Sequence, residues 1–490
     1  MMFVLRRYVI NGMCNGGCLA MVLLVLLFVG ACGAKEESQP PRDLPEIPVI
    51  GLEQLSDTIK NQFGLIQQQL AERPLDGGVN KTFARLLHAY SLTGPAAVMY
   101  RRCELLRPHD LDCLYLHALV QKELGNYTAA IDNLSKVLAR KTTFPRAAIV
   151  LADSYRITGE HERAAQIYQE ALRHDAKLLE ARYGLAVTLL NQGQLDKAYR
   201  HLQKIHAGKT RYGVVHTALA GVYRQTQNTE EVVYHTAAAK RFADVKIPYT
   251  DELLWEVQQL QIGASRYTRD ADRLFKAGRL EEAARLYHKT LEINPENDSS
   301  HANLVGIYGQ LGQLDKAQEH YELAIALNPS NVLPHMNLGT VLMKSADFSG
   351  ASTVFAKVLQ RQPRHAEART LHTYCAQLLQ QPYDVKQYRL ALRDDSTLPL
   401  ANYLLGRHIR AADGCAAALP FLEKSVRIEN AGTVAFMADY ATCLFRQEQQ
   451  EAGADVIRRG RRLAQQYRNQ GALRALDQVK AQFMSSNETS

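Results

Sequence analysis

The chain has 490 residues, of which 46% are hydrophobic and 22% charged, a composition typical of a soluble globular protein with enough apolar material for a core. Its formal charge of +8 comes from 58 basic and 50 acidic residues, an excess too small for this length to indicate nucleic-acid binding. The eight cysteines form no CxxC pair and no Cys/His cluster with zinc spacing, which excludes a disulfide-stapled scaffold.

The first 31 residues have the pattern of an export signal. Arg6 and Arg7 supply a basic start, and the apolar run that follows ends at Ala31, which makes it too short for a membrane-spanning helix of about 20 residues. The run closes with the sequence Val-Gly-Ala-Cys, which resembles the lipobox of bacterial lipoproteins. This resemblance implies that Cys32 carries a diacylglycerol and becomes the first residue of the mature chain. An ordinary signal peptide or anchor with a chance cysteine is the alternative.

Two further features bear on where the chain is delivered. The pair Arg6-Arg7 followed by Tyr8 leaves a twin-arginine export signal open. Gly33 stands where lipoproteins retained in the inner membrane carry aspartate, so the resemblance favours a periplasm-facing outer-membrane anchor if the envelope has two membranes. Prolines in the segment that follows keep it extended, and it is expected to act as a tether. The first amphipathic helix is expected from roughly Leu52 to Glu72.

A repeat of 34 residues governs most of the remaining sequence. Three prolines and five glycines recur at this interval within two stretches of the chain: Pro295, Pro329 and Pro363, then Gly125, Gly159 and Gly193, then Gly278 and Gly312. Around each glycine lie an apolar helical pattern, a short turn, a small residue and, four positions later, an aromatic residue or leucine. Each unit therefore predicts two helices joined by a turn.

The unit SHANLVGIYGQLGQLDKAQEHYELAIALNP, residues 300–329, shows the frame most clearly, and it resembles the tetratricopeptide repeat. Ala317 lets two helix backbones approach, and Tyr321 one turn later fills the space beside it. Gly312 ends the first helix and Pro329 ends the second. The resemblance implies an all-α solenoid of helical hairpins, a right-handed superhelix, in which each hairpin buries its apolar face only against its neighbours.

The repeat register shifts once, at a segment that contains the chain's single tryptophan. We read this segment as an irregular joint with an extra helix between two sub-arrays, and we expect the last long helix, Val456–Met484, to cap the array. Along the chain we expect a signal peptide (1–31), a lipidated cysteine and proline-rich tether (32–50), an N-terminal array (51–245), the joint (246–263), a central array (264–365), degenerate repeats with the cap (366–484) and a disordered tail (485–490).

No constellation in the sequence predicts catalysis or a cofactor. The chain lacks phosphate-binding glycine motifs, a nucleophile elbow and an HExxH pair. His216, His301 and His335 share one frame position that packs between helices, too far apart to share a zinc ion. Cys103 and Cys113 could form a disulfide across one turn, whereas Cys375, Cys415 and Cys443 are expected to be packing residues.

The resemblance implies that the first helices of the hairpins line a groove that takes an extended peptide or a partner helix. The positions expected to face it, and to bind the partner, are Tyr115, Arg146, Asp153, Arg156, Tyr183, Arg224, Asn303 and Asn337. We therefore expect a scaffold or assembly factor of the bacterial cell envelope that binds protein, with no nucleic-acid, metal, cofactor or small-molecule ligand. The alternative is an accessory subunit that localises an envelope enzyme such as a peptidase, a transferase or a respiratory complex.

Overall fold

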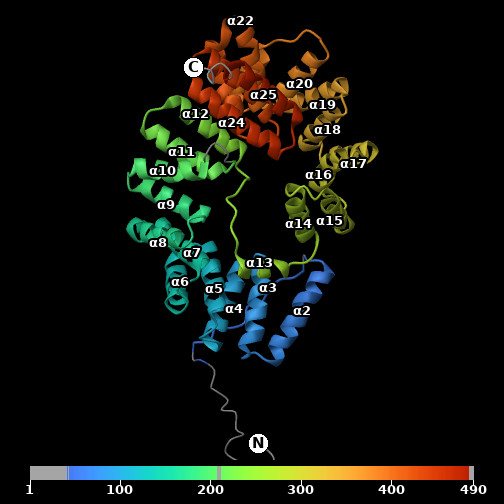
Figure 1. Ribbon diagram of the computed structural model, residues 1–490. Helices are drawn as coiled ribbons and strands as arrows, with labels where there is room; N and C mark the ends of the chain where they lie inside the picture. The colour runs from blue at the N-terminus through green and yellow to red at the C-terminus, as the bar shows by residue number, and fades with distance from the viewer. Residues whose placement is uncertain (1–40, 42, 54, 207–210, 485–490) are drawn as a thin grey trace, which may run out of the picture. The chain divides into compact units, whose positions relative to one another are not determined.

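The computed structural model describes residues 41–484 except 42, 54 and 207–210 (Figure 1). Within these residues the chain is all-α, with 24 α-helices, one 3-10 helix and no strand, as the sequence predicts. None of the described helices is both long and apolar enough to cross a bilayer. Residues from Ile47 onward form one compact unit, and the segment before it separates from this unit. The expected signal peptide, Cys32 and the tail at 485–490 lie outside the described residues.

The first part of the compact unit consists of one single helix and five helical hairpins. The single helix α2 (Asp57–Glu72) begins later than the expected Leu52. The hairpins are α3 (Gly77–Ala89) with α4 (Thr93–Leu106), α5 (Leu111–Glu123) with α6 (Tyr127–Arg140), α7 (Pro145–Ile157) with α8 (His161–His174), α9 (Leu179–Asn191) with α10 (Leu195–His206), and α11 (Gly213–Gln225) with α12 (Thr229–Arg241).

A short helix, α13 (Glu252–Gln259), separates these hairpins from the next series. Four more hairpins follow: α14 (Ala264–Lys276) with α15 (Leu280–Ile293), α16 (Asp298–Gln310) with α17 (Leu314–Leu327), α18 (Leu333–Lys344) with α19 (Phe348–Arg361), and α20 (Ala366–Leu378) with α21 (Lys386–Asp394). The C-terminal helices are α22 (Pro399–Val426), α23 (Met437–Arg446), α24 (Gln450–Gln466) and α25 (Gln470–Met484). A kink at Gly414, which takes a φ of 85°, divides α22 into two helical segments. The single long helix expected at Val456–Met484 is wrong, because Arg468 takes a φ of 52° and separates α24 from α25.

Each helix packs against the next one along the chain, so the hairpins stack in sequence order. The turn glycines found by their spacing take left-handed φ angles between 73° and 87°. Gln227 and Ala346 make the same turn at φ 57° and 62° without a glycine. A side chain at such an angle costs conformational energy, which the surrounding packing must offset.

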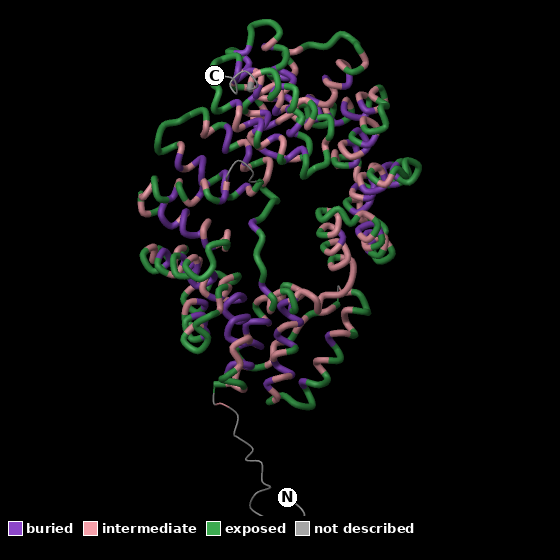
Figure 2. Tube along the Cα trace, viewed as in Figure 1, coloured by how far each residue is buried: buried purple, intermediate pink, exposed green. Residues whose placement is uncertain are grey.

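The buried residues run along the contacts between successive helices (Figure 2). Ala164 and Tyr168 of α8 are fully buried, and the Tyr168 ring lies against the backbone of Gly184 in the next hairpin. Small residues at these crossings therefore set how closely one hairpin can approach the next.

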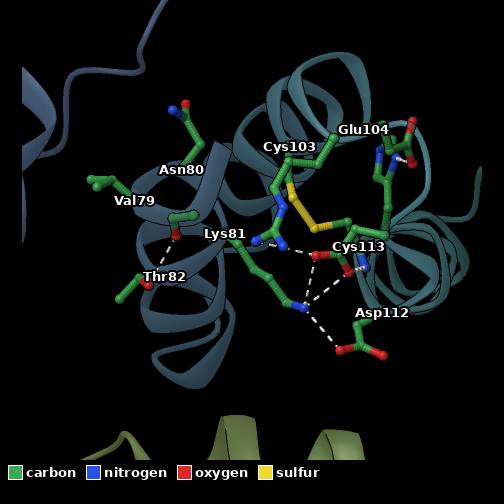
Figure 3. Close-up of a disulfide and its surroundings, with 12 residues drawn as sticks. Val79, Asn80, Lys81, Thr82, Cys103, Glu104, Asp112 and Cys113 are labelled. Carbon is green, nitrogen blue, oxygen red and sulfur yellow. Dashed lines mark hydrogen bonds and ion pairs between the residues drawn. A yellow bond between two sulfur atoms is a disulfide. The ribbon is translucent and has the colours of Figure 1, made fainter. Parts of the chain in front are cut away.

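Two disulfides link neighbouring helices. Cys103 in α4 is bonded to Cys113 in α5, with Cα atoms 6.2 Å apart, and Cys415 in α22 is bonded to Cys443 in α23, with Cα atoms 5.0 Å apart. The second bond corrects the expectation that Cys415 and Cys443 only pack. Beside the first bond, Lys81 Nζ lies 2.8 Å from an Asp112 oxygen (Figure 3).

Replacing Gly184 with alanine is expected to destabilise the array. An added Cβ would lie 2.3 Å from Cζ of Tyr168, whose buried ring has no free space to move into, so the cost is about 1–3 kcal/mol. Gly221→Ala is the matched control, because nothing lies within 4 Å of its Cβ position in α11 and helix propensity should raise stability by up to about 1 kcal/mol. Urea unfolding followed by circular dichroism tests the pair. Equal midpoints for the two variants would contradict this packing.

Candidate functional site

The candidate site is built around residues 246–263, which we call the strap. The strap leaves α12, crosses the first helices of the N-terminal hairpins and ends at α14 (Figure 1). Its path lies on the face formed by α3, α5, α7, α9 and α11, which we call the first-helix face. Direct contacts between α5, α7, α9 and α11 make this face continuous.

The first part of the strap is fixed by an apolar and an aromatic contact. Ile247 is buried in a cluster that includes Ala186 of α9 and Leu219 of α11. Tyr249 lies beneath the guanidinium of Arg146, with Cζ 4.0 Å from the ring centroid. A cation over an aromatic face contributes about 0.5–1 kcal/mol at a partly exposed site.

A buried carboxylate holds the middle of the strap. Tyr115 donates its hydroxyl hydrogen to Asp251 Oδ2 at 2.5 Å, and Arg146 Nε donates to the same oxygen at 3.3 Å. The other oxygen of Asp251 accepts from the backbone N–H of Leu254 and caps α13. Burial, and next the Asp251 carboxylate, raise the pKa of Tyr115, so the phenol stays protonated and remains a donor.

The last part of the strap is held by α2 and α3. Val257 is buried in the N-terminal core, and Arg85 forms an ion pair with Glu256 at 2.9 Å. Gln62 donates to the carbonyl of Leu260 at 2.8 Å, and the hydroxyl of Tyr90 accepts from the backbone N–H of Ile262 at 2.9 Å. The strap is therefore bound along its whole length to the array that precedes it.

Two of the residues expected to face a partner are thus engaged within the chain. The prediction that Tyr115 is exposed is wrong, because Tyr115 is fully buried beneath the strap. Arg146 is largely covered and also pairs with Glu180. The sequence placed both residues on the correct helix face, but a segment more than 100 residues away covers that face.

Three further expected residues lie together beside the strap. Tyr168 donates to Asp153 Oδ1 at 2.6 Å, and Arg156 lies 3.7 Å from the same oxygen. Lys122 Nζ contacts the other oxygen of Asp153 at 3.3 Å. Tyr183 is half-buried, and burial raises its pKa. The structure thus joins Asp153 and Arg156 in one polar network with Lys122 and Tyr168 rather than leaving them separately exposed.

The remaining expected residues lie outside that network. Arg224 is exposed and has no ion pair among the residues the structure describes. Asn303 donates to the Tyr287 hydroxyl at 3.0 Å, and Asn337 donates to the Ala302 carbonyl at 2.8 Å. No described group donates to the side-chain oxygen of either asparagine, so both can accept a hydrogen bond from a partner.

The first helix of the central array, α14, lines a cleft with the strap. In the described part of the chain, several residues of the first helices α14, α16 and α18 are exposed: Ser265, Arg269, Ser299, Leu333 and Thr340. The strap itself exposes Tyr249 and Trp255, the latter to 53%, so the chain's single tryptophan is a surface residue. Sequence reasoning identified this segment as a joint but missed that its Asp251 binds Tyr115 and Arg146 of the N-terminal hairpins.

Histidines form two equivalent buried pairs, each between the two helices of one hairpin. Nδ1 of His216 lies 2.8 Å from Nδ1 of His235, and the same distance separates these atoms of His301 and His320. Burial, followed by neighbouring histidines, lowers the pKa of His235 to about 2 and that of His320 to about 4. His335 is also buried and contacts the Tyr321 hydroxyl at 2.8 Å.

Models of one repeat family match the chain in both arrays. Three tetratricopeptide repeat models match residues 115–178, residues 155–220 with 274–324, and residues 306–345. No curated protein matches the sequence.

Several solved structures share the helical architecture. PilF of Pseudomonas aeruginosa is 16% identical over 44% of this chain and 96% of its own, with a TM-score of 0.36. The yeast Tom70 is 15% identical over 85% of this chain and 100% of its own, with a TM-score of 0.38. The Cut9–Hcn1 heterotetramer of the APC/C is 13% identical over 86% of this chain and 93% of its own, with a TM-score of 0.39.

Loss of the Asp251 carboxylate is expected to loosen the strap. Asp251→Ala leaves the buried Tyr115 hydroxyl without its acceptor and removes the cap of α13, which should lower the local free energy of opening by about 1–3 kcal/mol. Hydrogen exchange followed by mass spectrometry should show faster exchange across residues 246–263. Glu252→Ala, an exposed neighbour in the same helical turn, is the control. Equal exchange in both variants would show that the carboxylate does not hold the strap.

Stability is expected to fall as the pH drops from 6.5 toward 4. The pKa of His235 and His320 is lowered in the folded state, so the unfolded chain binds more protons than the folded chain in this pH range. Each histidine therefore lowers the free energy of unfolding by about 1.4 kcal/mol for every pH unit of acidification. Urea midpoints at pH 7 and pH 5 measure the slope, and His235→Asn should reduce it. The exposed His109→Asn is the control. A midpoint that does not change with pH would refute this assignment.

Proposed function

We propose that this chain, whose hairpins include tetratricopeptide repeats, is a protein-interaction scaffold of the cell envelope that binds an extended segment of a partner protein. The proposal rests on a difference between the first helices of the two arrays. The strap covers Tyr115 and most of Arg146 on the face of the N-terminal hairpins, whereas the first helices α14, α16 and α18 keep several exposed side chains.

The chemistry of the open face suits a peptide. Asn303 and Asn337 offer side-chain oxygens to backbone N–H groups, and Leu333 offers an apolar contact that is 41% exposed. Repeats of this kind are stiff because each hairpin is held by two neighbours, so the face is formed before the partner arrives. A preformed face reduces the entropy cost of ordering the complex.

The proposed location is the oxidising side of an envelope, with the chain anchored by lipid at Cys32. Two disulfides between packed helices support an oxidising compartment, since such bonds are rare where thiols are kept reduced. The buried free thiol of Cys375 has no partner cysteine among the described residues, and burial raises its pKa to about 11. The lipobox-like end of the apolar run supports Cys32 as the attachment point.

A photo-crosslinking residue should locate the binding face. With benzoylphenylalanine at Leu333 or Thr340, on the open face, we expect a crosslinked partner in whole cells. The same residue at Leu323, which is 41% exposed on the second helix α17, is the matched control and should give no product. Crosslinks from Leu323 alone would place the partner on the opposite helix layer and overturn this assignment.

Lipid attachment is tested by metabolic labelling with a radioactive fatty acid. The wild-type chain should incorporate the label and fractionate with membranes, whereas Cys32→Ser should do neither, because the thioether to diacylglycerol cannot form. Cys18→Ser is the control and should label normally. A wild-type chain without label would refute the proposed anchor.

A further inference from the structure

We propose that the strap is itself a docking edge, and that an acidic, extended peptide segment pairs with its backbone in the cleft between the strap and α14. This inference rests on the proposed function, because it names the chemistry of the partner and the place of first contact. The strap, which is bound to the N-terminal hairpins, would then also form part of the binding surface of the central array.

The cleft has a volume of about 890 Å³. One wall is the strap from Lys246 to Tyr249, and the other is one face of α14 with Ser265, Thr268 and Asp272. The loop that carries Asn294 and Asn297 lies at its end. The cleft is therefore bounded by an irregular backbone on one side and by the first helix of the central array on the other.

The strap has the side-chain alternation of an extended strand before α13 begins. Ile247, Tyr249 and Asp251 all contact the N-terminal hairpins, through the apolar cluster, Arg146 and Tyr115 respectively. In an extended chain, successive side chains point to opposite sides of the backbone. The side chains of Lys246, Pro248 and Thr250 should therefore point away from the N-terminal hairpins. Lys246, Pro248 and Thr250 are exposed, whereas Ile247 and Asp251 are buried, and Tyr249 stays 48% exposed beneath Arg146.

The backbone of this extended segment is unused within the described part of the chain. No backbone N–H or carbonyl of residues 246–250 forms a hydrogen bond there. Pro248 has no N–H, so Ile247 and Tyr249 are the residues that can both donate and accept on one edge. An unpaired edge of this kind can add a peptide strand, with main-chain hydrogen bonds giving affinity.

The basic residues that line the cleft favour an acidic partner. Lys246 and Lys276 have no ion pair among the described residues, and Arg269 donates only to the neutral oxygens of Gln261 and Gln258. Arg273 pairs with Asp270 at the exposed rim, and Asp272 accepts from the Tyr287 hydroxyl. Three cations without an acidic partner, Lys246, Arg269 and Lys276, thus line the cleft with the single carboxylate of Asp272, which favours glutamate or aspartate side chains on the bound segment.

The probe is the acetylated, amidated octapeptide (Glu-Val)4 carrying fluorescein, and the readouts are its anisotropy and the fluorescence of Trp255, the single tryptophan. With the full chain in detergent we expect saturable binding that weakens as salt rises. Lys246→Glu with Lys276→Glu should weaken binding at least tenfold. Lys357→Glu, an exposed lysine on α19, is the matched control and should leave binding unchanged.

A second peptide tests the backbone pairing without altering the protein. The same octapeptide with alternate N-methylated amides keeps its charge but cannot pair as a strand, so it should bind at least tenfold more weakly. Equal binding of the two peptides, or of polyphosphate of matched charge, would overturn strand pairing in favour of simple ionic attraction.

The remaining outcomes separate this inference from the proposed function. If the octapeptide does not bind while Leu333 still crosslinks to a partner, the docking edge is wrong and the scaffold proposal stands. If binding appears only after deletion of residues 33–46, the chain's own acidic tether fills the cleft and the partner assignment is overturned. If neither binding nor crosslinking occurs, both proposals fail.

Discussion

The buried carboxylate of Asp251 holds the strap against the first helices of the N-terminal hairpins. Asp251 accepts from Tyr115 and Arg146, whose side chains come from two successive first helices, and it also caps α13. A buried carboxylate is costly unless its oxygens accept hydrogen bonds, and these donors supply them. The contact therefore fixes the strap on the N-terminal hairpins and covers Tyr115 and most of Arg146, which other proteins cannot then reach.

Because the hairpins stack, a segment that binds along their first helices links several hairpins together. Each hairpin buries its apolar residues against its neighbours, so the first helices form a stiff and continuous face. A segment bound along that face, from Ile247 near α11 to Ile262 near α3, touches several hairpins at once. The strap thereby couples hairpins that do not contact one another, and its residues 246–249 line a cleft with α14 of the central array.

The sequence predicts the repeats well because their constraints are local. Glycine and proline spacing identifies the turns, and the alanine and aromatic positions identify which faces pack. Where another residue makes the turn, as at Gln227 and Ala346, the spacing signal is lost although the fold continues. The long capping helix is mispredicted for a related reason. Arg468 ends the first part of it with a left-handed φ, and the sequence has no glycine there to indicate a turn.

The site was less predictable because its contacts span large distances in sequence. Helical periodicity places Tyr115 on the first-helix face but says nothing about the strap residue, 136 positions later, that covers it. The pairing of Cys415 with Cys443 likewise depends on how α22 and α23 approach each other. A double-mutant cycle tests the central contact most directly: Tyr115→Phe, Asp251→Asn and the double variant, with the opening free energy of the strap measured by hydrogen exchange. The account predicts a coupling of about 1 kcal/mol or more between the two residues. Strictly additive effects would contradict it.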